Sequence, residues 1–318
     1  MIQIRRAAIA VPMLVVLALP AAVSAALPGQ SVTAFPMAAG AAPFGVTAGP
    51  RGEWVSLNTR IGLFDRQNHL TTYPIPTPDS LAGWLTVDPA GAVWMSERDG
   101  GNMARISPNG SIVEFPLPTG ADAVPQGSVV APDGTLYVTE QGANAIAHLD
   151  PATGHVTDFQ VPTADALPLG LTLGSDGALW FTERSAAQIG RMTLDGVFRE
   201  WPLDPGAFPN RIVTAPDGAV WFTELFGGKI GRMSPNGTLT EYPIDGGPVG
   251  ITVGRDGQLY VALDFAKQVG RVNLHGTVTG TWDLPGAVAP LQIATGRGHD
   301  LWVTDSSANT VFRLTSAP

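Results

Sequence analysis

The sequence predicts an all-β fold, a seven-bladed β-propeller of four-stranded antiparallel blades. The first observation is a block of about forty residues that recurs along the chain, each copy marked by an aromatic residue in a short apolar segment. The landmarks are Trp54, Trp94, Tyr137, Trp180, Trp221, Tyr260 and Trp302. Such a period indicates repeats that bury their apolar faces against one another. The second observation is that no segment keeps a helical apolar period, so we expect almost no helix.

One repeat, residues 209–243, shows the strands of a blade most clearly. The expected strands are Ile212 to Ala215, Val220 to Glu224, Lys229 to Met233 and Thr238 to Pro243. Turns rich in proline, asparagine, aspartate and glycine separate the first two strands and the last two. The strands themselves carry β-branched and aromatic residues. We therefore expect each blade to be an antiparallel meander.

The two ends of the chain complement each other. The last repeat stops after its third strand, at residues 311–314, whereas residues 31–36 match a fourth strand. We expect this N-terminal segment to complete the last blade, with Thr33 to Phe35 paired to the strand that contains Phe312. Such pairing closes the ring without an open edge. Residues 26–318 then form one domain.

Residues 1–25 have the pattern of a secretory signal peptide. Two arginines precede an apolar run at residues 7–19, and a small-x-small cleavage site follows at residues 23–25. The run is shorter than the ~20 residues that span a bilayer, so we expect cleavage, with a retained membrane anchor as the alternative. Cleavage predicts a secreted or periplasmic protein that is not held in the membrane.

Composition limits the partners. The chain has no cysteine, so we expect no disulfide or thiolate metal site. It has 18 Lys and Arg against 27 Asp and Glu, for a formal net charge of −9. An acidic protein repels phosphate backbones, which disfavours nucleic acid as a partner. We expect a monomer that binds a small molecule, a peptide or a cell-envelope component.

The repeat also resembles that of the virginiamycin B lyase (streptogramin lyase) family. The closest copies are Trp180-Phe181-Thr182-Glu183 with Ile189-Gly190-Arg191, and Trp221-Phe222-Thr223-Glu224 with Ile230-Gly231-Arg232. The resemblance covers the chain after residue 25 and implies a seven-bladed propeller. Because it rests on residues that every blade needs, it implies more about fold than about chemistry.

The resemblance also implies a carbon-oxygen lyase site in the last blade. It places a catalytic histidine at the second position of a Pro-x-Gly motif, a Mg²⁺-binding glutamate two residues earlier, and a second glutamate after the last Trp-containing strand. The matching positions here are Leu291, Ala289 and Asp305 or Ser306. Leucine cannot accept a proton and alanine cannot bind a metal ion. We therefore expect no cofactor, with Mg²⁺ required only if the protein is a lyase.

A carboxylate recurs at the end of the second strand. The residues are Glu97, Glu140, Glu183, Glu224 and Asp305. They could form a cation site or an acid/base pair. We interpret them instead as architecture, bonded to loop amides or paired with repeated arginines such as Arg105, Arg191, Arg232 and Arg271. The histidines are expected in outer strands and turns, which disfavours a metal site or a general base built on them.

Departures from the repeat give the candidate binding residues. Trp84, Arg211 and Gln292 replace the glycine of the Pro-x-Gly motif that precedes the innermost strand, and Phe44, Gln126 and Asn210 occupy its x position. Together they would make one mouth of the central channel apolar and hydrogen-bonding, as ligand pockets are. Alternatively they fill gaps between unequal blades. Phe226 and Phe265, in loops of the same face, would add an apolar patch.

We therefore predict an exported binding module that uses this channel mouth. One alternative is a lyase that opens cyclic depsipeptides of the streptogramin B class. Another is a metal-dependent lactone hydrolase like those on other propellers, which would need clustered channel carboxylates. No carboxylate occupies an x position of the Pro-x-Gly motif.

Overall fold

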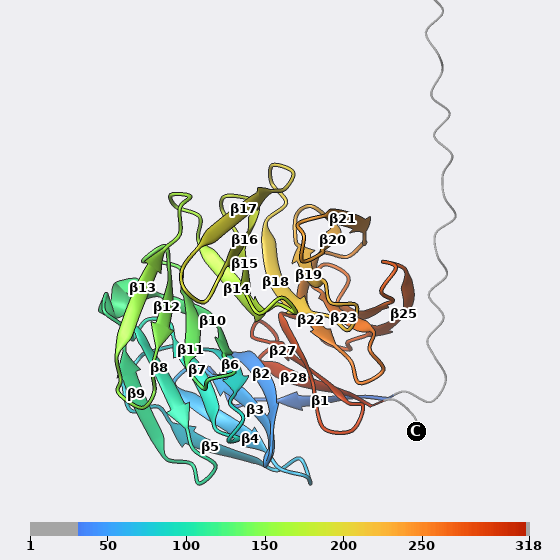
Figure 1. The fold of residues 1–318 in the computed structure, drawn as a ribbon. Helices are drawn as coiled ribbons and strands as arrows, with labels where there is room; N and C mark the ends of the chain where they lie inside the picture. The colour runs from blue at the N-terminus through green and yellow to red at the C-terminus, as the bar shows by residue number, and fades with distance from the viewer. Residues whose placement is uncertain (1–30, 316–318) are drawn as a thin grey trace, which may run out of the picture.

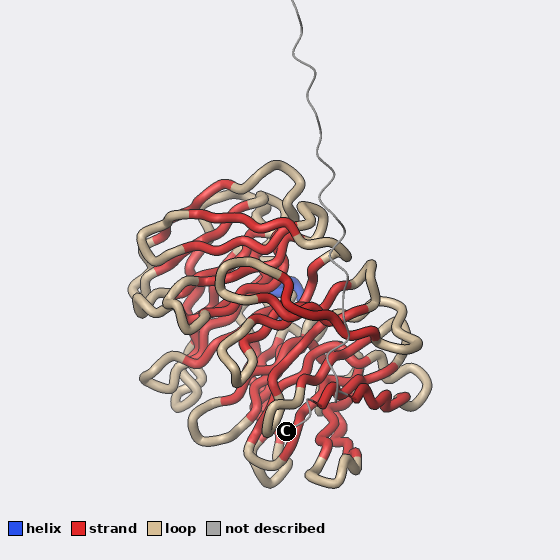
Figure 2. The backbone as a smooth tube through the Cα atoms, turned by 90° about the vertical axis from the view of Figure 1, so that its right-hand side faces the viewer, coloured by secondary structure: helices blue, strands red, loops and turns tan. Residues whose placement is uncertain are grey.

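The computed structural model describes residues 31–315, which form a ring of seven four-stranded antiparallel sheets. Figure 1 and Figure 2 show the ring, in which strands and short loops make up nearly the whole described chain. The 3₁₀ turn η1 (Gly120–Ala123) is the one helical element among the described residues. None of the helices within residues 31–315 is long and apolar enough to cross a bilayer. The predicted signal peptide, residues 1–25, lies outside the described residues.

Strands follow one another from the channel outwards in blades one to six. Blade one contains β2 (Pro43–Gly49), β3 (Gly52–Leu57), β4 (Arg60–Phe64) and β5 (Leu70–Pro74). Blade two contains β6 (Ala82–Val87), β7 (Val93–Glu97), β8 (Asn102–Ile106) and β9 (Ile112–Pro116). Blade three contains β10 (Pro125–Val130), β11 (Leu136–Glu140), β12 (Ala145–Leu149) and β13 (Val156–Gln160).

The second half of the ring repeats this arrangement. Blade four contains β14 (Pro168–Leu173), β15 (Leu179–Glu183), β16 (Gln188–Met192) and β17 (Phe198–Pro202). Blade five contains β18 (Pro209–Thr214), β19 (Val220–Glu224), β20 (Lys229–Met233) and β21 (Leu239–Pro243). Blade six contains β22 (Pro248–Val253), β23 (Leu259–Leu263), β24 (Gln268–Val272) and β25 (Val278–Asp283). Blade seven contains β26 (Gln292–Thr295), β27 (Leu301–Asp305), β28 (Thr310–Thr315) and β1 (Ser31–Pro36).

The predicted closure of the ring is confirmed. β1 pairs antiparallel with β28, and Ala34 lies opposite Phe312. Figure 1 shows the blue β1 beside the red end of the chain. Phe35 on β1 stacks on Trp302 with 5.6 Å between ring centroids and contacts Phe64 of blade one at 5.2 Å. The fourth strand of the last blade therefore also supplies part of the core between the last and first blades.

The first strand of blade five begins earlier than its apolar run indicates. It begins at Pro209 and not at Ile212, because the residues between them form a bulge. Pro209 lies opposite Glu224 and Ile212 opposite Phe222, so the first strand has an extra residue. A bulge turns side chains out of the regular alternation. Trp84 and Arg211 therefore lie on strand bulges next to the channel, whereas Gln292 begins a strand with regular register.

The landmark aromatics belong to the cores between blades. All except Tyr260 are at most 3% exposed. Trp180 donates a hydrogen bond to Asp176 Oδ1 at 3.1 Å, and Arg191 pairs with Asp176 Oδ2 at 2.8 Å. The same arginine and aspartate pair recurs in other blades. The prediction that repeated arginines pair with the second-strand glutamates is therefore wrong, because the arginines reach the aspartates of the first turn.

Candidate functional site

Buried hydroxyl groups hold the channel mouth in place. They come two residues after the landmark aromatic in six blades and are Ser56, Ser96, Thr139, Thr182, Thr223 and Thr304. Thr182 Oγ1 accepts from the Gly170 amide at 2.8 Å and donates to the Asn210 carbonyl of the next blade at 2.9 Å. Thr304 links the last blade to the first through the Phe44 carbonyl at 2.6 Å. These bonds fix the backbone of the Pro-x-Gly segments across the blade boundaries.

The glycine of the Pro-x-Gly motif is required where the next blade comes close. A Cβ on Gly127 would lie 2.6 Å from the Leu169 carbonyl oxygen, and one on Gly170 would lie 2.7 Å from that of Asn210. Real Cβ atoms do not approach oxygen so closely, so these blades accept only glycine. In the three blades that carry Trp84, Arg211 and Gln292, the backbone of the next blade must therefore leave more space beside this position of the motif.

Arg211 crosses the channel. Its guanidinium, from blade five, lies directly over the Trp84 ring of blade two and 6.0 Å from the centroid of the Phe44 ring of blade one. With its amide oxygen turned to the guanidinium, Gln292 of blade seven accepts from Arg211 Nε at 3.1 Å and Nη1 at 3.2 Å. Arg211 is only 5% exposed. Side chains far apart in the sequence thus form a floor across the channel mouth.

Trp84 continues this floor to the third blade. Its indole Nε1 donates to Gln126 Oε1 at 3.0 Å, and Gln126 Nε2 donates to Gln141 Oε1 at 3.4 Å. Gln126 is buried and Trp84 is half-buried. Asn210 is also buried, and its backbone carbonyl belongs to the hydroxyl network described above. Five of the predicted residues, Phe44, Trp84, Gln126, Arg211 and Gln292, therefore contact one another in a chain around the mouth.

Two arginines that the sequence prediction missed lie at the same mouth. The Arg98 guanidinium lies 5.3 Å from the centroid of the Phe44 ring, and that of Arg184 lies 4.1 Å from the centroid of the Phe208 ring. Both residues come four positions after a landmark aromatic, where the residue type changes from blade to blade. That variability is the signal that would have found them.

The electrostatics of this mouth are unusual for buried groups. Burial lowers the pKa of Arg211 well below its usual value, and the positive charges of Arg184 and Arg98 lower it further. Burial, and then the charge of Arg98, likewise lowers the pKa of Arg184. Within the described part of the chain, none of the three arginines has a carboxylate in salt-bridge distance. The site is locally positive in an acidic protein.

The two predicted phenylalanines of the loops are exposed. Phe226 is 63% exposed and contacts Phe208 with 4.8 Å between ring centroids. Phe208 in turn lies under the Arg184 guanidinium, so Phe226 extends the arginine-lined mouth outwards. Phe265 is 60% exposed and lies against the turn that contains Gly247. Among the described residues, no ring contact joins Phe265 to Arg211 or to the side chains that contact Arg211.

The recurrent carboxylates behave differently from one another. Asp305 accepts from the amides of Val288 at 2.7 Å, Ala289 at 2.9 Å and Ala308 at 2.7 Å, as predicted for a residue that holds loop amides. Glu140, Glu183 and Glu224 are fully buried, and neither oxygen of any of them accepts a hydrogen bond from an amide, guanidinium or hydroxyl group among residues 31–315. For these three glutamates the predicted bonds to loop amides or arginines are not found.

The surroundings of each of these glutamates raise its pKa and so favour its neutral form. Burial, and then a carboxylate of the outer strand, raises the pKa of Glu140 and Glu183 to about 8, with Asp158 facing the first and Glu200 the second. A group of three or more metal-binding side chains is not present among residues 31–315. The glutamates are therefore separate carboxyl pairs, one in each of several blades.

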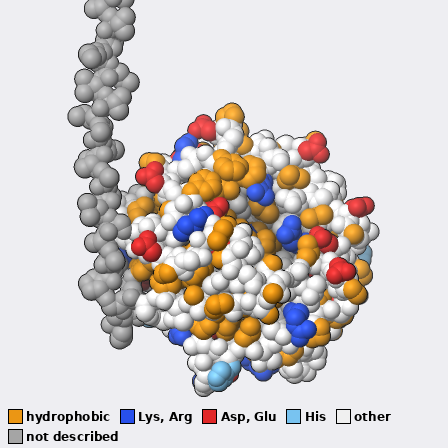
Figure 3. Space-filling view, turned by 180° about the vertical axis from the view of Figure 1, so that it is seen from behind, with side chains coloured by type: hydrophobic (Ala, Val, Ile, Leu, Met, Phe, Trp, Pro, Cys, Tyr) orange, Lys and Arg blue, Asp and Glu red, His pale blue; other side chains and the backbone are white. Residues whose placement is uncertain are grey.

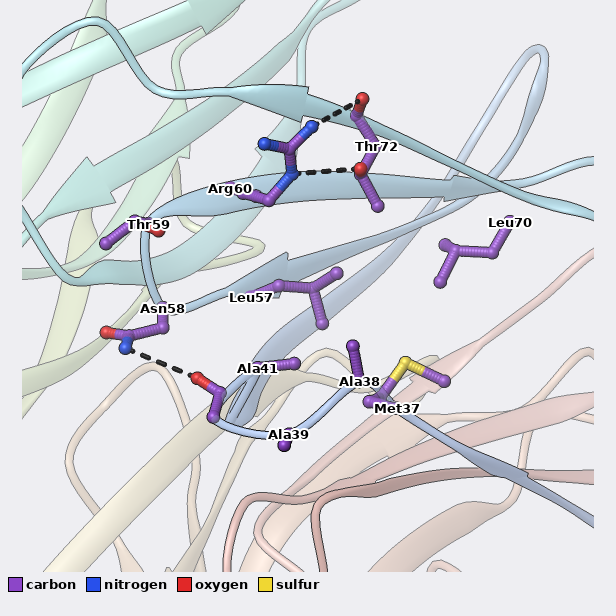
Figure 4. Close-up of a pocket in the computed structure, with 11 residues that line it drawn as sticks. Met37, Ala38, Ala39, Ala41, Leu57, Asn58, Thr59, Arg60, Leu70 and Thr72 are labelled. Carbon is purple, nitrogen blue, oxygen red and sulfur yellow. Dashed lines mark hydrogen bonds between the residues drawn. The ribbon is translucent and has the colours of Figure 1, made fainter.

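Three cavities among the described residues lie away from this mouth. The one in Figure 4 has a volume of about 280 Å³ and lies between the alanine-rich loop that follows β1 and the outer part of blade one. Arg60 at its edge donates to Thr72 Oγ1 at 2.9 Å. The cavity has no acid/base pair. Figure 3 shows a face of the molecule on which acidic and basic side chains are interspersed among apolar groups.

A closed seven-bladed ring with a polar and aromatic channel mouth defines the protein as a β-propeller whose distinctive residues gather at one end of the channel. The chain belongs to the virginiamycin B lyase family, whose profile matches residues 23–152 and 121–318. The predicted family and fold are thus confirmed. A comparison with curated protein sequences gave no match.

Solved structures of the same family are similar over nearly the whole chain. A streptogramin B lyase structure is 29% identical, with a TM-score of 0.86, and the match covers 92% of this chain and 99% of that one. The virginiamycin B lyase from Staphylococcus aureus is 29% identical, with a TM-score of 0.84 over 90% and 99% of the two chains. A catalytically inactive histidine-to-alanine variant of that enzyme with quinupristin is 28% identical, with a TM-score of 0.84 and the same coverage.

Proposed function

We propose that the protein is an exported binding module that holds a ligand, peptide or cell-envelope component at the channel mouth described above. One observation carries this proposal: Arg211 spans the channel and joins Trp84, Phe44 and Gln292 from three other blades. An apolar surface with a few converging polar groups is the usual composition of a ligand site. Export is supported by the signal pattern of residues 1–25.

The residues at the position of the family's catalytic site do not support lyase chemistry. Leu291 and Ala289 stand where the family resemblance implies the base and the metal ligand, and neither side chain can bind a proton or a cation. The Asp305 carboxylate already accepts three backbone amides. The residues present therefore do not fit the Mg²⁺ that the resemblance implies, and we assign no step to it.

A lyase acting on streptogramin B antibiotics is the second candidate, and membership of the family favours it. Binding of such a depsipeptide without opening it would reconcile the two candidates. One similar structure contains quinupristin, so a streptogramin B antibiotic belongs among the compounds tested.

A thermal-shift screen of the purified full-length protein tests the binding function. Streptogramin B, peptides, sugars and lactones are added to the wild type, to Trp84→Ala and Arg211→Ala, and to the control Arg199→Ala on the exposed outer strand of blade four. A true ligand should stabilise the wild type and the control. Its affinity for Arg211→Ala should fall by about 1.5 to 3 kcal/mol, the scale of a charge-assisted hydrogen bond. A ligand that stabilises all four proteins equally would place its site elsewhere.

A further inference from the structure

The channel mouth contains three guanidinium groups without a counter-charge. Six other arginines of the described chain form salt bridges, namely Arg105, Arg191, Arg232, Arg271, Arg297 and Arg313. Arg98, Arg184 and Arg211 form none. The other described arginines without a salt bridge, Arg51, Arg60, Arg66, Arg199 and Arg255, are all exposed to solvent, so the arginines that are shielded from solvent and lack a counter-charge are the three at this mouth.

The hydrogen-bond donors of these arginines are also incomplete. Arg98 Nε and Arg184 Nε are buried and have no hydrogen-bond partner among residues 31–315. Leaving a buried donor without a partner costs about 1 to 3 kcal/mol, and more when the group is charged. Bringing like charges together adds to that cost. An arrangement that costs stability in this way is expected at a binding site.

We propose that Arg98, Arg184 and Arg211 form an anion site that takes the carboxylate of a ligand with an aromatic or apolar body. This inference rests on the proposed function and names the class of its ligand. A guanidinium presents paired N–H donors that match a carboxylate, and the unused Nε donors of Arg98 and Arg184 supply one side of such pairs.

The rings around the site select the rest of the ligand. Arg98 and Arg211 both lie within 6.0 Å of the centroid of the Phe44 ring. Arg184 lies over Phe208, which contacts the exposed Phe226. A carboxylate held by the arginines would therefore have aromatic surface on two sides. These rings favour a ligand whose charge is attached to an apolar group over a small inorganic anion.

Isothermal titration calorimetry of the full-length protein with three probes tests the site. The probes are phenylacetate, its neutral counterpart phenylacetamide, and phenyl phosphate. Arg98→Gln and Arg184→Gln should each weaken phenylacetate binding by about tenfold or more, while Arg199→Gln on the outer strand should not change it. Because both substitutions remove a desolvated charge, they should not lower the melting temperature. A purely structural role would lower it.

The outcomes separate the ligand class from the binding function. Tighter binding of phenylacetate than of phenylacetamide, lost in both arginine variants, supports the site. Equal binding of the two, sensitive only to Trp84→Ala, overturns the anion site and keeps the binding function. Preference for phenyl phosphate overturns the carboxylate assignment in favour of a phosphate group. Failure of all three probes to bind the wild type overturns the inference, and the thermal-shift screen then decides the binding function on its own.

Discussion

Arg211 is a buried cation whose charged neighbours are also cations. It keeps its place through the Trp84 ring and the Gln292 amide and not through an ion pair. Contact with an aromatic face and a neutral acceptor recovers only part of the hydration that the guanidinium loses. Burial of Arg211 therefore lowers the stability of the unliganded protein, and a bound anionic ligand would reduce this loss.

Replacing Arg211 by an apolar side chain of similar length should stabilise the unliganded protein. Arg211→Met should raise the free energy of unfolding by about 1 kcal/mol or more, since it removes an unpaired buried charge. Urea denaturation at neutral pH measures the change. Arg232→Met in the same blade is the matched control, because Arg232 pairs with Asp217 at 2.7 Å and should show no gain. Equal destabilisation of both variants would contradict the argument.

The buried glutamates give the fold a definite pH dependence. Burial, and then the facing carboxylate, raises the pKa of Glu140, Glu183 and Glu224 from 4.5 to about 8, and that of Glu97 to about 7 because of burial. Lys229, beside Glu224, opposes the shift there. The folded state thus holds protons that the unfolded chain releases. This contribution is fully present below pH 4.5 and is lost as the pH rises towards 8.

The protein should therefore be more stable at a pH of about 5 than at about 8.5. Each of these carboxyls should contribute on the order of 1 kcal/mol to the difference. Melting temperatures across this range measure it. Glu183→Gln, which stays neutral at every pH, should reduce the slope, whereas Asp195→Asn in an exposed turn should leave it unchanged. A slope identical in wild type and Glu183→Gln would show that Glu183 is ionised in the folded protein.

At the level of elements, β1 contributes more to the closure of the ring than its mostly exposed side chains indicate. Most of its side chains face solvent, but Phe35 packs on Trp302 and Phe64. The strand also supplies the last row of backbone hydrogen bonds in blade seven. Its attachment joins the two ends of the chain and covers the edge of β28, which would otherwise be unpaired.

Truncating this one side chain should weaken the closure. Phe35→Ala should lower the free energy of unfolding by about 2 kcal/mol or more through lost burial and ring contacts. Thr33→Ala, an exposed neighbour on the same strand, should change it by less than about 0.5 kcal/mol. Both values come from urea titration. If Phe35→Ala matched Thr33→Ala, the strand would contribute only its backbone pairing.

At the scale of the whole molecule, the ring brings distant residues into one site. Phe44 and Gln292 lie near opposite ends of the chain, yet both contact Arg211. The hydroxyl network joins neighbouring blades at the same level, and Thr304 links the last blade to the first through the Phe44 carbonyl. The local positive charge of the mouth contrasts with the formal net charge of −9, so the protein as a whole repels anions that this mouth would attract.

Comparison of the chain with its family also predicts that one reaction, the opening of virginiamycin B, is not catalysed. With Leu291 and Ala289 at the positions of the base and the metal ligand, we expect no Mg²⁺-dependent opening of virginiamycin B. Mass spectrometry of the antibiotic incubated with the full-length protein and Mg²⁺ measures linear product. Boiled protein gives the background. Turnover above that background would restore the lyase as the function and require a base that these positions do not supply.

The sequence predicts those features of the fold that depend on interactions between residues close together in the chain. The strands, their turns and the period between the landmark aromatics follow from alternation, turn residues and repeated burial. The complementary ends of the chain were enough to place β1 beside β28. The start of the first strand of blade five was predicted too late, because a bulge interrupts the alternation on which strand prediction depends.

The sequence by itself thus determined the number of blades, the closure of the ring and the positions that depart from the repeat. Only the tertiary structure decided which of those positions meet. Arg211 contacts Trp84 across the channel, and Arg98 and Arg184 remain without carboxylate partners because the repeated aspartates lie at the far ends of the first strands. Contacts across the axis depend on the diameter of the ring and on bulge geometry, and neither leaves a pattern along the chain.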